Sequence, residues 1–436
     1  MPTQRFTLLA LQSVLQQLLQ GTGRWRRPVQ AGRWQLSAVT LLAWLGCRWQ
    51  PQCLGAPDYP DARHPYLETA SDWQGMLGQA EHARVAPLLY TVARTCGVCP
   101  PPVERALHDV YAFTAVQNRL RLRELTTILA TLEVADIPAI VLKGAALAGV
   151  VYGDIALRPM SDLDVLVRRE HVNLSLDRFT CLGWTVGSIE PRTGTTLDYE
   201  NELLLVGPPP ARNLLEIHWD LLDSPHHQRT IDNNWLWQTA QPAHLGGVIA
   251  LILGPEAQLL HLCAHLAFHH GRGDQPVLLW QHDVAQVLHV YRDRLDWDVI
   301  LTKAQAFDLV LPLQQVLGQV LAMWSVPVPD NAMQRLAQLH PSPAEAVVFN
   351  GSPKAIAQWR NASGTIYPAC PIGVRGPNSP CRTFFPHQPT CANATISPRA
   401  SRFCCRTHID GPSAFKKPSP SAVNSRILVD GFCIYL

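Results

Sequence analysis

The sequence predicts an α+β protein in which a small mixed-sheet core is flanked by helical regions on both sides. Three patterns predict it: apolar residues at helical spacing early in the chain, short strand-like runs in the middle, and helical spacing again afterwards. We therefore expect a helical N-terminal region at 1–134, a core at 135–222, a helical C-terminal domain at 223–330 and a tail at 331–436.

The N-terminal region is predicted from three amphipathic stretches, near 8–19, 76–89 and 103–134, in which apolar side chains recur three or four positions apart. Such stripes are usually the faces by which helices pack into a core. We identify no chemical function in these stretches.

The core begins where the pattern changes at Ile137. A short run of strand-forming residues ends at Lys143 and Gly144, and a short helix is expected from Ala145 to Val151. Further strands are then expected at 162–167, 203–206 and 214–219, with a helix that begins near Val172 and stops at Gly183.

The last two regions differ sharply in pattern. Helical spacing returns past Pro255 and continues to about Trp324. The tail is rich in Pro, Ser and Cys and shows no period beyond about residue 350. We interpret it as disordered or as a non-native extension.

Charge is unevenly distributed along the chain, although the net charge is only +2. Residues 351–436 hold ten Lys and Arg against two acidic residues, which leaves 26 basic and 32 acidic residues in 1–350. The patterned part is thus mildly acidic and offers no broad basic face to a nucleic-acid duplex. We predict that duplex nucleic acid is not a partner.

Cysteine usage and hydropathy bear on location. The single Cys-x-x-Cys pair, Cys96 and Cys99, lacks the second pair of a zinc site and precedes three prolines. No signal peptide is visible, and the apolar runs are too short to span a bilayer. We therefore expect a cytoplasmic protein with reduced thiols and no membrane partner.

Three carboxylates are placed for metal-assisted phosphate chemistry. Along the strand 162–167, Asp162 and Asp164 point to one face because strand side chains alternate. In the strand 214–219, Glu216 and His218 share a face, so Glu216 can join the two aspartates if the strands are neighbours. Carboxylates in such a group hold Mg²⁺ against phosphates, although a histidine at 218 is more often a core residue.

The turn after the first strand supplies groups that suit phosphate. Gly144 lets the backbone approach closely, and the helix expected from Ala145 offers free N–H groups. Lys143 adds a point charge, and Arg158 adds a planar fork of donors. Arg158 has a structural alternative, since it can cap the loop or pair with Asp162.

These segments resemble the uncharacterised nucleotidyltransferases of the polymerase-beta superfamily. The resemblance is carried by Val141-Leu-Lys-Gly-Ala-Ala-Leu147, by Tyr152-Gly-Asp154 and by Arg158-Pro-Met-Ser-Asp-Leu-Asp-Val-Leu-Val167. Weaker matches follow at Leu215-Glu-Ile-His-Trp219, at His261-Leu-Cys-Ala-His265, and at Trp280 with Asp283. The similarity extends over roughly 70–330.

The resemblance implies a bacterial enzyme that uses Mg²⁺ to move a nucleoside monophosphate, AMP from ATP by preference, to an acceptor hydroxyl with release of pyrophosphate. It implies Asp162, Asp164 and Glu216 as catalytic metal ligands, with Lys143, Gly144, Ala145, Arg158 and Ser161 binding the nucleotide. The acceptor stays open between a small molecule and a protein. Ala145 departs from the pattern, because the superfamily places Ser after the Gly, and a hydroxyl contact to phosphate is lost.

Two alternatives remain. The core could bind a nucleotide without turnover and act as an interaction module, for example in a toxin–antitoxin pair, which the Ala145 departure favours. Alternatively, the helical domain could be a metal phosphohydrolase that uses His261, His265, His282 and Asp283. His261, His265 and His269 recur every four residues on one helix face, but no Glu lies between them and core packing explains them better.

Overall fold

In the computed structural model, the residues that can be described are Leu41, Leu45 and the ranges 73–96, 99–187, 200–270 and 278–351. All of them belong to the first of two units, Met1–Ile366 and Tyr367–Leu436. The helix expected near 8–19 and the tail beyond 351 lie outside the described residues. Within the described ranges, no helix is both long and apolar enough to cross a membrane.

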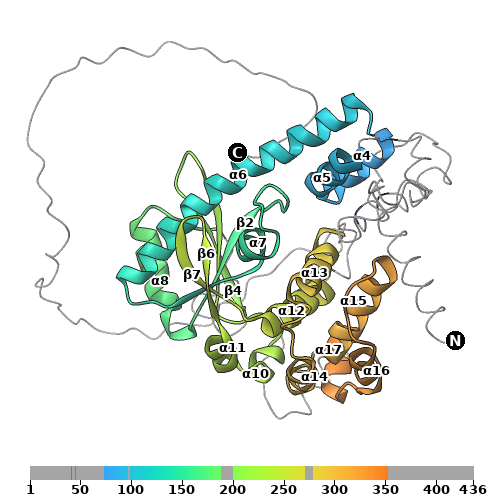
Figure 1. The fold of residues 1–436 in the computed structure, drawn as a ribbon. Coiled ribbons are helices and arrows are strands. Elements are labelled where there is room, and N and C mark those ends of the chain that lie inside the picture. The colour runs from blue at the N-terminus through green and yellow to red at the C-terminus, as the bar shows by residue number, and fades with distance from the viewer. Residues whose placement is uncertain are drawn as a thin grey trace, which may run out of the picture. The chain divides into compact units, whose positions relative to one another are not determined.

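The described part is a mixed α+β structure, as the sequence predicts, with thirteen α-helices and one seven-stranded sheet (Figure 1). The strands are β1 (Ala139–Val141), β2 (Asp162–Val167), β3 (Thr185–Val186), β4 (Glu202–Val206), β5 (Leu214–His218), β6 (Gln241–Leu245) and β7 (Val248–Ile252). Their order is β3-β4-β5-β2-β1-β7-β6. The pairs β2–β5 and β1–β7 are parallel and the other neighbours are antiparallel.

The helices that precede the sheet or lie within it are α4 (Trp73–His82), α5 (Ala86–Cys96), α6 (Pro101–Val134), α7 (Lys143–Ala146) and α8 (Val172–Cys181). A π-helical segment, η2 (Leu147–Val151), continues α7, and a 3-10 turn, η3 (Arg169–His171), precedes α8. The short connections α10 (His227–Thr230) and α11 (Asn233–Thr239) follow β5.

The C-terminal helices are α12 (Pro255–His265), α13 (Leu278–Tyr291), α14 (Trp297–Ala306), α15 (Val310–Met323), α16 (Asp330–Gln338) and α17 (Pro343–Asn350). The π-helical segment η4 (Leu266–His270) extends α12. Helices α12 and α13 pack against each other and both contact α15.

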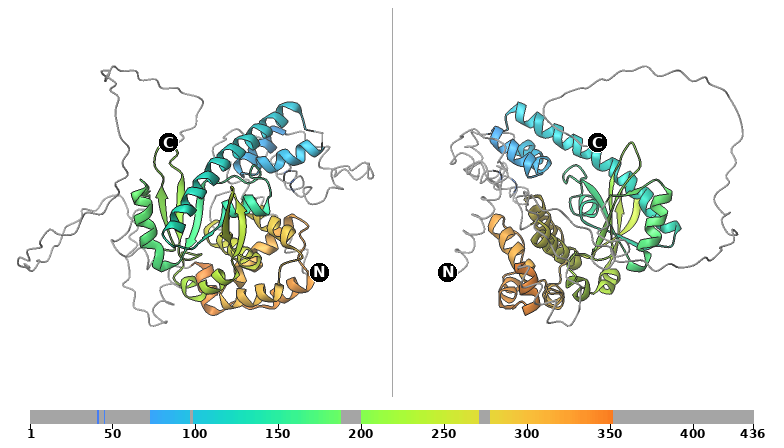
Figure 2. Two further views of the ribbon diagram at one scale, coloured as in Figure 1. Left: turned by 60° about the vertical axis from the view of Figure 1, so that its left-hand side comes forward. Right: turned by 180° about the vertical axis from the view of Figure 1, so that it is seen from behind.

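Apolar clusters cover both faces of the sheet. On one face, Leu163, Val165 and Val167 of β2 pack with buried residues of α6 and α8. On the other, Ile140 and Leu166 join a larger cluster with α12 and α13 (Figures 1 and 2). Since β2 side chains alternate, Asp162 and Asp164 share the face of Leu166. The carboxylates are therefore directed toward the side of the sheet on which α12 and α13 lie.

Two segments differ from the expected pattern. The region from 223 was expected to be helical, but β6 and β7 form a hairpin that extends the sheet beside β1. Its turn is Gly246-Gly247, with φ of +60° and +97°, the conformation that a two-residue hairpin turn requires. The continuous apolar run Val248–Ile252 then forms the inner strand, and it was missed because it directly precedes a strongly helical segment.

Residues just past 330 were assigned to the tail, yet α16 and α17 are helical there. Ser342 caps α17 by accepting a hydrogen bond from the Glu345 backbone N–H, Pro343 takes the first turn, and Gly351 ends the helix in the left-handed conformation. These are ordinary start and stop signals in a short segment without a long apolar stripe. The domain boundaries at 134, 222 and 330 stay predictions.

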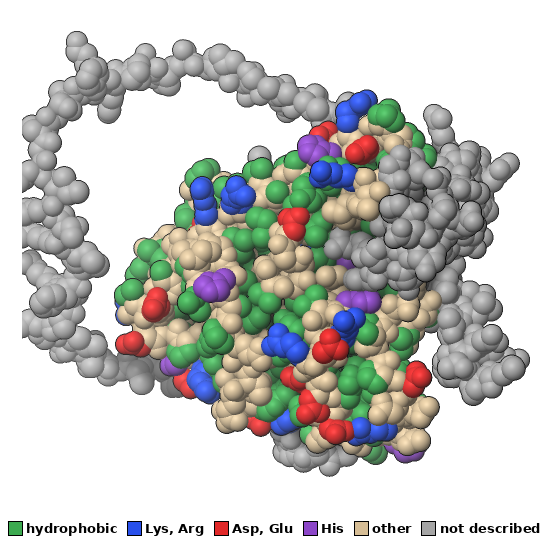
Figure 3. All heavy atoms as spheres, viewed as in Figure 1, with side chains coloured by type: hydrophobic (Ala, Val, Ile, Leu, Met, Phe, Trp, Pro, Cys, Tyr) green, Lys and Arg blue, Asp and Glu red, His purple; other side chains and the backbone are tan. Residues whose placement is uncertain are grey.

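The described side chains on the face of Figure 3 do not sort by charge. Lys and Arg are interspersed with Asp and Glu among apolar and neutral side chains in that view. The positive charge seen there is not gathered into one patch.

Candidate active site

The register between β2 and β5 brings two of the predicted carboxylates together. These strands are parallel, with Asp164 opposite Glu216 and Leu166 opposite His218. On the far side of β5, the antiparallel strand β4 places Glu202 opposite His218. Because side chains alternate along these strands, four polar side chains cluster on one face of the sheet: Asp164, Glu202, Glu216 and His218.

Lys143 lies at the centre of this cluster. Its Nζ donates to Asp164 Oδ1 at 2.7 Å and to Glu216 Oε2 at 3.3 Å, and it lies 3.5 Å from His218 Nε2. The backbone of Lys143 has a φ of +42°, in the left-handed region that a lysine seldom adopts. Strained backbone conformations of this kind concentrate at functional sites. The turn that carries Lys143 therefore directs its ammonium group into the carboxylates.

His218 is the fourth member of this cluster, although its sequence context favoured a core histidine. The ring is buried, and Nε2 lies 3.2 Å from Asp164 Oδ1 and 3.4 Å from Glu216 Oε2, while Nδ1 lies 3.0 Å from Glu202 Oε2. The spacing Glu216-x-His218 was the signal for this arrangement. It places both side chains on the face that Asp164 also occupies.

The charges in the cluster shift one another's pKa values. Burial alone would raise the pKa of Asp164, but Lys143 and His218 hold it well below its usual range. Burial raises the pKa of Glu216, and the nearby Asp164 adds to this effect. Burial opposes the charged forms of Lys143 and His218, yet their carboxylate neighbours raise the pKa of both groups. The cluster therefore keeps Asp164 ionised and leaves Glu216 the easier carboxylate to protonate.

The same cluster suits a divalent metal ion. One oxygen or nitrogen atom from each of Asp164, Glu216 and His218 lies within 4.8 Å of the others, and no other such trio of His, Cys, Asp or Glu occurs among the described residues. Carboxylate oxygens are the ligands that Mg²⁺ and Mn²⁺ prefer, and imidazole is compatible with transition metals. The donor set thus fits a divalent ion, without identifying which one.

Asp162 lies on the same face but outside this trio. It is partly exposed, and its Oδ2 accepts a hydrogen bond from Ser161 Oγ at 3.1 Å. Burial and the neighbouring Asp164 raise its pKa. Asp162 therefore extends the acidic face by one strand position toward the loop that precedes β2.

Arg158 makes a buried ion pair instead of lying exposed for a ligand. Its Nη2 donates to Asp283 Oδ2 at 2.9 Å, and Nε lies within 3.3 Å of both carboxylate oxygens of Asp283. Tyr152 donates to Asp283 Oδ1 at 2.8 Å and lies equally close to His282 Nδ1. This network joins the loop before β2 to α13, and the guanidinium that was expected to bind phosphate is committed to Asp283.

Gly144 is required by the close approach of that arginine. A Cβ atom at this position would lie 2.5 Å from Arg158 Nη1 and 3.1 Å from Met160 Cγ. The next residue, Ala145, is buried, and the α-helix that starts at Lys143 changes to a π-helical segment at Leu147. The absence of a side chain at Gly144 thus lets the turn that carries Lys143 pack closely against the Arg158 side chain.

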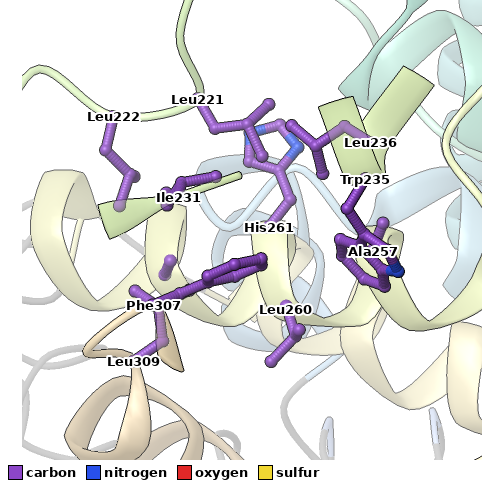
Figure 4. Close-up of a pocket in the computed structure, with 11 residues that line it drawn as sticks. Leu221, Leu222, Ile231, Trp235, Leu236, Ala257, Leu260, His261, Phe307 and Leu309 are labelled. Carbon is purple, nitrogen blue, oxygen red and sulfur yellow. The ribbon is translucent and has the colours of Figure 1, made fainter. Parts of the chain in front are cut away.

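The histidines of α12 do not assemble a metal site with α13. His282 lies against Tyr152, and Asp283 is paired with Arg158. The rings of His261 and His265 are 6.0 Å apart, centroid to centroid, in an edge contact. His261 instead faces a small apolar cavity, together with Leu221, Leu236 and other residues shown in Figure 4. The structure therefore gives no support to a phosphohydrolase centre in these helices.

A strand, a Lys-Gly turn, an Asp-x-Asp strand and a third carboxylate on the adjacent parallel strand define a nucleotidyltransferase-type site. The sequence matches the family described as uncharacterised nucleotidyltransferase over residues 69–324. The chain belongs to this family and is a transferase of nucleotidyl groups, as predicted, and membership implies a nucleoside triphosphate substrate. No curated protein and no solved structure is significantly similar to it.

Proposed function

We propose that the protein uses Mg²⁺ to transfer AMP from ATP to an acceptor hydroxyl, with release of pyrophosphate. The observation that carries this proposal is the joining of Asp164, Glu216 and His218 around Lys143 on adjacent strands. Asp162 completes the acidic face. A divalent ion bound to these carboxylates supplies positive charge against the phosphate oxygens.

The chain's own residues account for the remaining requirements. The acceptor oxygen bonds to the α-phosphorus, the bond from that phosphorus to the bridging oxygen breaks, and pyrophosphate leaves with the bond electrons. We assign the acceptor's proton to Glu216, because its side chain is 20% exposed, against 2% for Asp164, and is therefore the more open to an acceptor. His218 holds Glu216 and Asp164 in place through its Nε2.

Lys143 and its turn are assigned to the nucleotide. The Lys143 side chain is long and flexible, so its ammonium can turn from the carboxylates to a phosphate oxygen. Gly144, Ala145 and Ser161 line the same turn and loop and are assigned to the nucleotide with it. Arg158 is assigned an indirect role. Its guanidinium packs against Gly144 in the turn, and Asp283 fixes the guanidinium there.

A second function is favoured by Lys143 and Ala145. The Lys143 ammonium already neutralises Asp164 and Glu216, and Ala145 lacks the hydroxyl of the superfamily pattern. Such a site would bind a nucleotide without turnover and serve a partner protein. Release of pyrophosphate separates the two functions, because only the transferase produces it.

The cellular location and the acceptor are proposed from fewer observations. A cytoplasmic location agrees with the thiols of Cys181 and Cys263, which are not in disulfides. The acceptor is proposed to be a small molecule or a protein that presents a hydroxyl group.

The test is nucleotide binding by thermal shift, with each of the four nucleoside triphosphates, in Mg²⁺ and in EDTA. We expect a Mg²⁺-dependent stabilisation of the wild type, largest with ATP, and its loss in Asp164→Asn. Asp177→Asn, which alters an exposed carboxylate on α8, serves as the matched control and keeps the wild-type shift. Stabilisation that is equal in Asp164→Asn would overturn the proposal.

A further inference from the structure

Two arginines outside the sheet lie without an anionic partner near the acidic face. Arg84 is in the turn between α4 and α5, and Arg121 is on α6. Both side chains are half-buried. Within the described residues, neither guanidinium makes a hydrogen bond or an ion pair, and the Nε of Arg121 is fully enclosed without a hydrogen-bond partner. Polar and charged groups removed from water are normally paired, so this arrangement is unusual.

Helix α6 fixes Arg121 over the loop that leads into β2. One turn earlier on the same helix face, the buried Asn118 donates to the backbone oxygens of Ile155 and Arg158. Nearer the start of α6, Tyr111 donates to Asp154 at 2.7 Å. These contacts tie the helix to residues 154–158, and the chain reaches Ser161 and Asp162 three and four residues beyond Arg158.

Arg84 lies at the end of α4 on a strained backbone. Its φ is +60°, a conformation that favours glycine at the end of a helix, and its N–H donates to Glu81 O to close α4. Helices α4 and α5 pack beside the first half of α6 (Figure 1).

The electrostatics agree that the two arginines share one neighbourhood. Burial lowers the pKa of Arg84, with Arg158 and Arg121 adding to it and Asp162 and Asp283 opposing it. Burial likewise lowers the pKa of Arg121, and Asp162 opposes this. Arg158 is already neutralised by Asp283. Neither Arg84 nor Arg121 is in an ion pair among the described residues, so the two arginines add positive charge to the surroundings of Asp162.

We propose that Arg84 and Arg121 form the subsite for the β- and γ-phosphates of the nucleoside triphosphate. The inference rests on the proposed function. In this assignment the carboxylates on β2 and β5 act at the α-phosphate, and the two arginines bind the part that leaves as pyrophosphate. Arginine presents a planar fork of donors that suits phosphate oxygens. The N-terminal helices, which showed no chemistry in the sequence, then supply the leaving-group half of the site.

The experiment measures binding of MgATP, Mg-tripolyphosphate and AMP to the full chain by calorimetry. The variants are Arg121→Gln and Arg84→Gly. The glycine suits the positive φ of residue 84, so this variant keeps or gains thermal stability while it loses the guanidinium. Arg123→Gln is the matched control, because Arg123 is exposed on the same helix two residues from Arg121.

We expect each of the two variants to weaken MgATP and tripolyphosphate binding roughly tenfold or more, as loss of a charge-assisted hydrogen bond implies. Binding of AMP and the behaviour of Arg123→Gln should stay at wild-type values. Unchanged tripolyphosphate affinity in both variants, or no tripolyphosphate binding by the wild type, would overturn the subsite.

These outcomes separate the subsite from the reaction. If MgATP binding requires Asp164 but neither arginine, the subsite is wrong and the proposed function stands. If tripolyphosphate binding requires the arginines but no triphosphate yields pyrophosphate, the subsite is supported and the proposed reaction fails.

Discussion

Two buried histidines, His218 on β5 and His261 on α12, show how differently this fold uses the same side chain. Three carboxylates surround the ring of His218, and its pKa is raised although burial and Lys143 oppose this. The ring of His261 lies among leucines, Trp235 and Phe307 (Figure 4), and its pKa is lowered to about 3, mainly by burial, with the positive charges of Lys143 and His218 adding to this. The first ring is part of an ionic cluster, and the second is a neutral packing element.

The comparison teaches that neighbours, and not spacing within one element, decide which polar residues form a site. The repeat of His261, His265 and His269 on one helix face was the more conspicuous pattern in the sequence. His218 had a single cue, its place two residues after Glu216. The pairing of β5 with β2 and β4 brings carboxylates to His218, whereas the packing of α12 surrounds His261 with apolar side chains.

The largest effect is expected from breaking the ionic cluster. Replacing Asp164 by Asn removes the carboxylate that pairs with Lys143 and would hold the metal ion, so nucleotidyl transfer should fall about a thousandfold or more. Pyrophosphate release from ATP measures this. The variant His261→Phe, on the other side of the comparison, should retain transfer within a fewfold of wild type. A similar loss in both variants would contradict the distinction.

The next largest effect is expected on stability, from breaking the buried ion pair between Arg158 and Asp283. Asp283→Ala leaves Arg158 buried without a counter-charge, which typically costs about 3–5 kcal/mol. Urea unfolding of the variant should show this loss in the free energy of unfolding. The control is Arg335→Gln, which removes an exposed ion pair with Asp298 and should change stability by about 0–1 kcal/mol. Equal losses would mean that the Arg158 pair is not buried as described.

The turn that carries Lys143 can be probed by adding one methyl group. In Gly144→Ala the new Cβ meets Arg158 Nη1, whose retreat is opposed by Asp283, so we expect a loss of about 1–3 kcal/mol. The same substitution at Gly318, where no atom lies within 4 Å of the added Cβ, should stabilise α15 by roughly 0.5–1 kcal/mol. Denaturant unfolding of the two variants tests whether the changes have opposite signs.

The smallest effect is expected on the pH dependence of stability, which tests whether His261 is a buried neutral ring. The folded-state pKa of His261, about 3, lies below its unfolded value of 6.5. The unfolded chain therefore binds the proton first as pH falls, so stability is full above pH 6.5 and declines below it. Between pH 7.5 and 5.5 this group should contribute a loss of about 1 kcal/mol.

His261→Phe should lack that part of the decline when unfolding is compared at the two pH values. His244→Gln, which changes an exposed histidine on β6, should decline as the wild type does. A decline of full size in His261→Phe would show that the ring is not a buried neutral group.

Much of this fold was predictable because its signals are local. The alternation in 162–167 placed Asp162 and Asp164 on one face, and the apolar flanks of Glu216 marked a strand. The family resemblance was likewise confirmed over residues 69–324. The roles of the individual site residues remain proposals.

What the sequence could not predict depends on contacts between distant segments. Arg158 and Asp283 are 125 residues apart, and only the packing of α13 against the loop before β2 brings them together. The hairpin of β6 and β7 joins the sheet next to β1, more than a hundred residues away in sequence. The placement of Arg84 and Arg121 near Asp162 depends in the same way on how α4, α5 and α6 pack.

The most direct test of the central claim is to locate the metal ion. Crystals grown with Mn²⁺ and a non-hydrolysable ATP analogue would show the ion by its anomalous scattering. We predict a peak in contact with Asp164 and Glu216, with the Lys143 ammonium moved toward the phosphates. A peak at the α12 histidines, or a bound nucleotide with no ion at Asp164, would contradict the account.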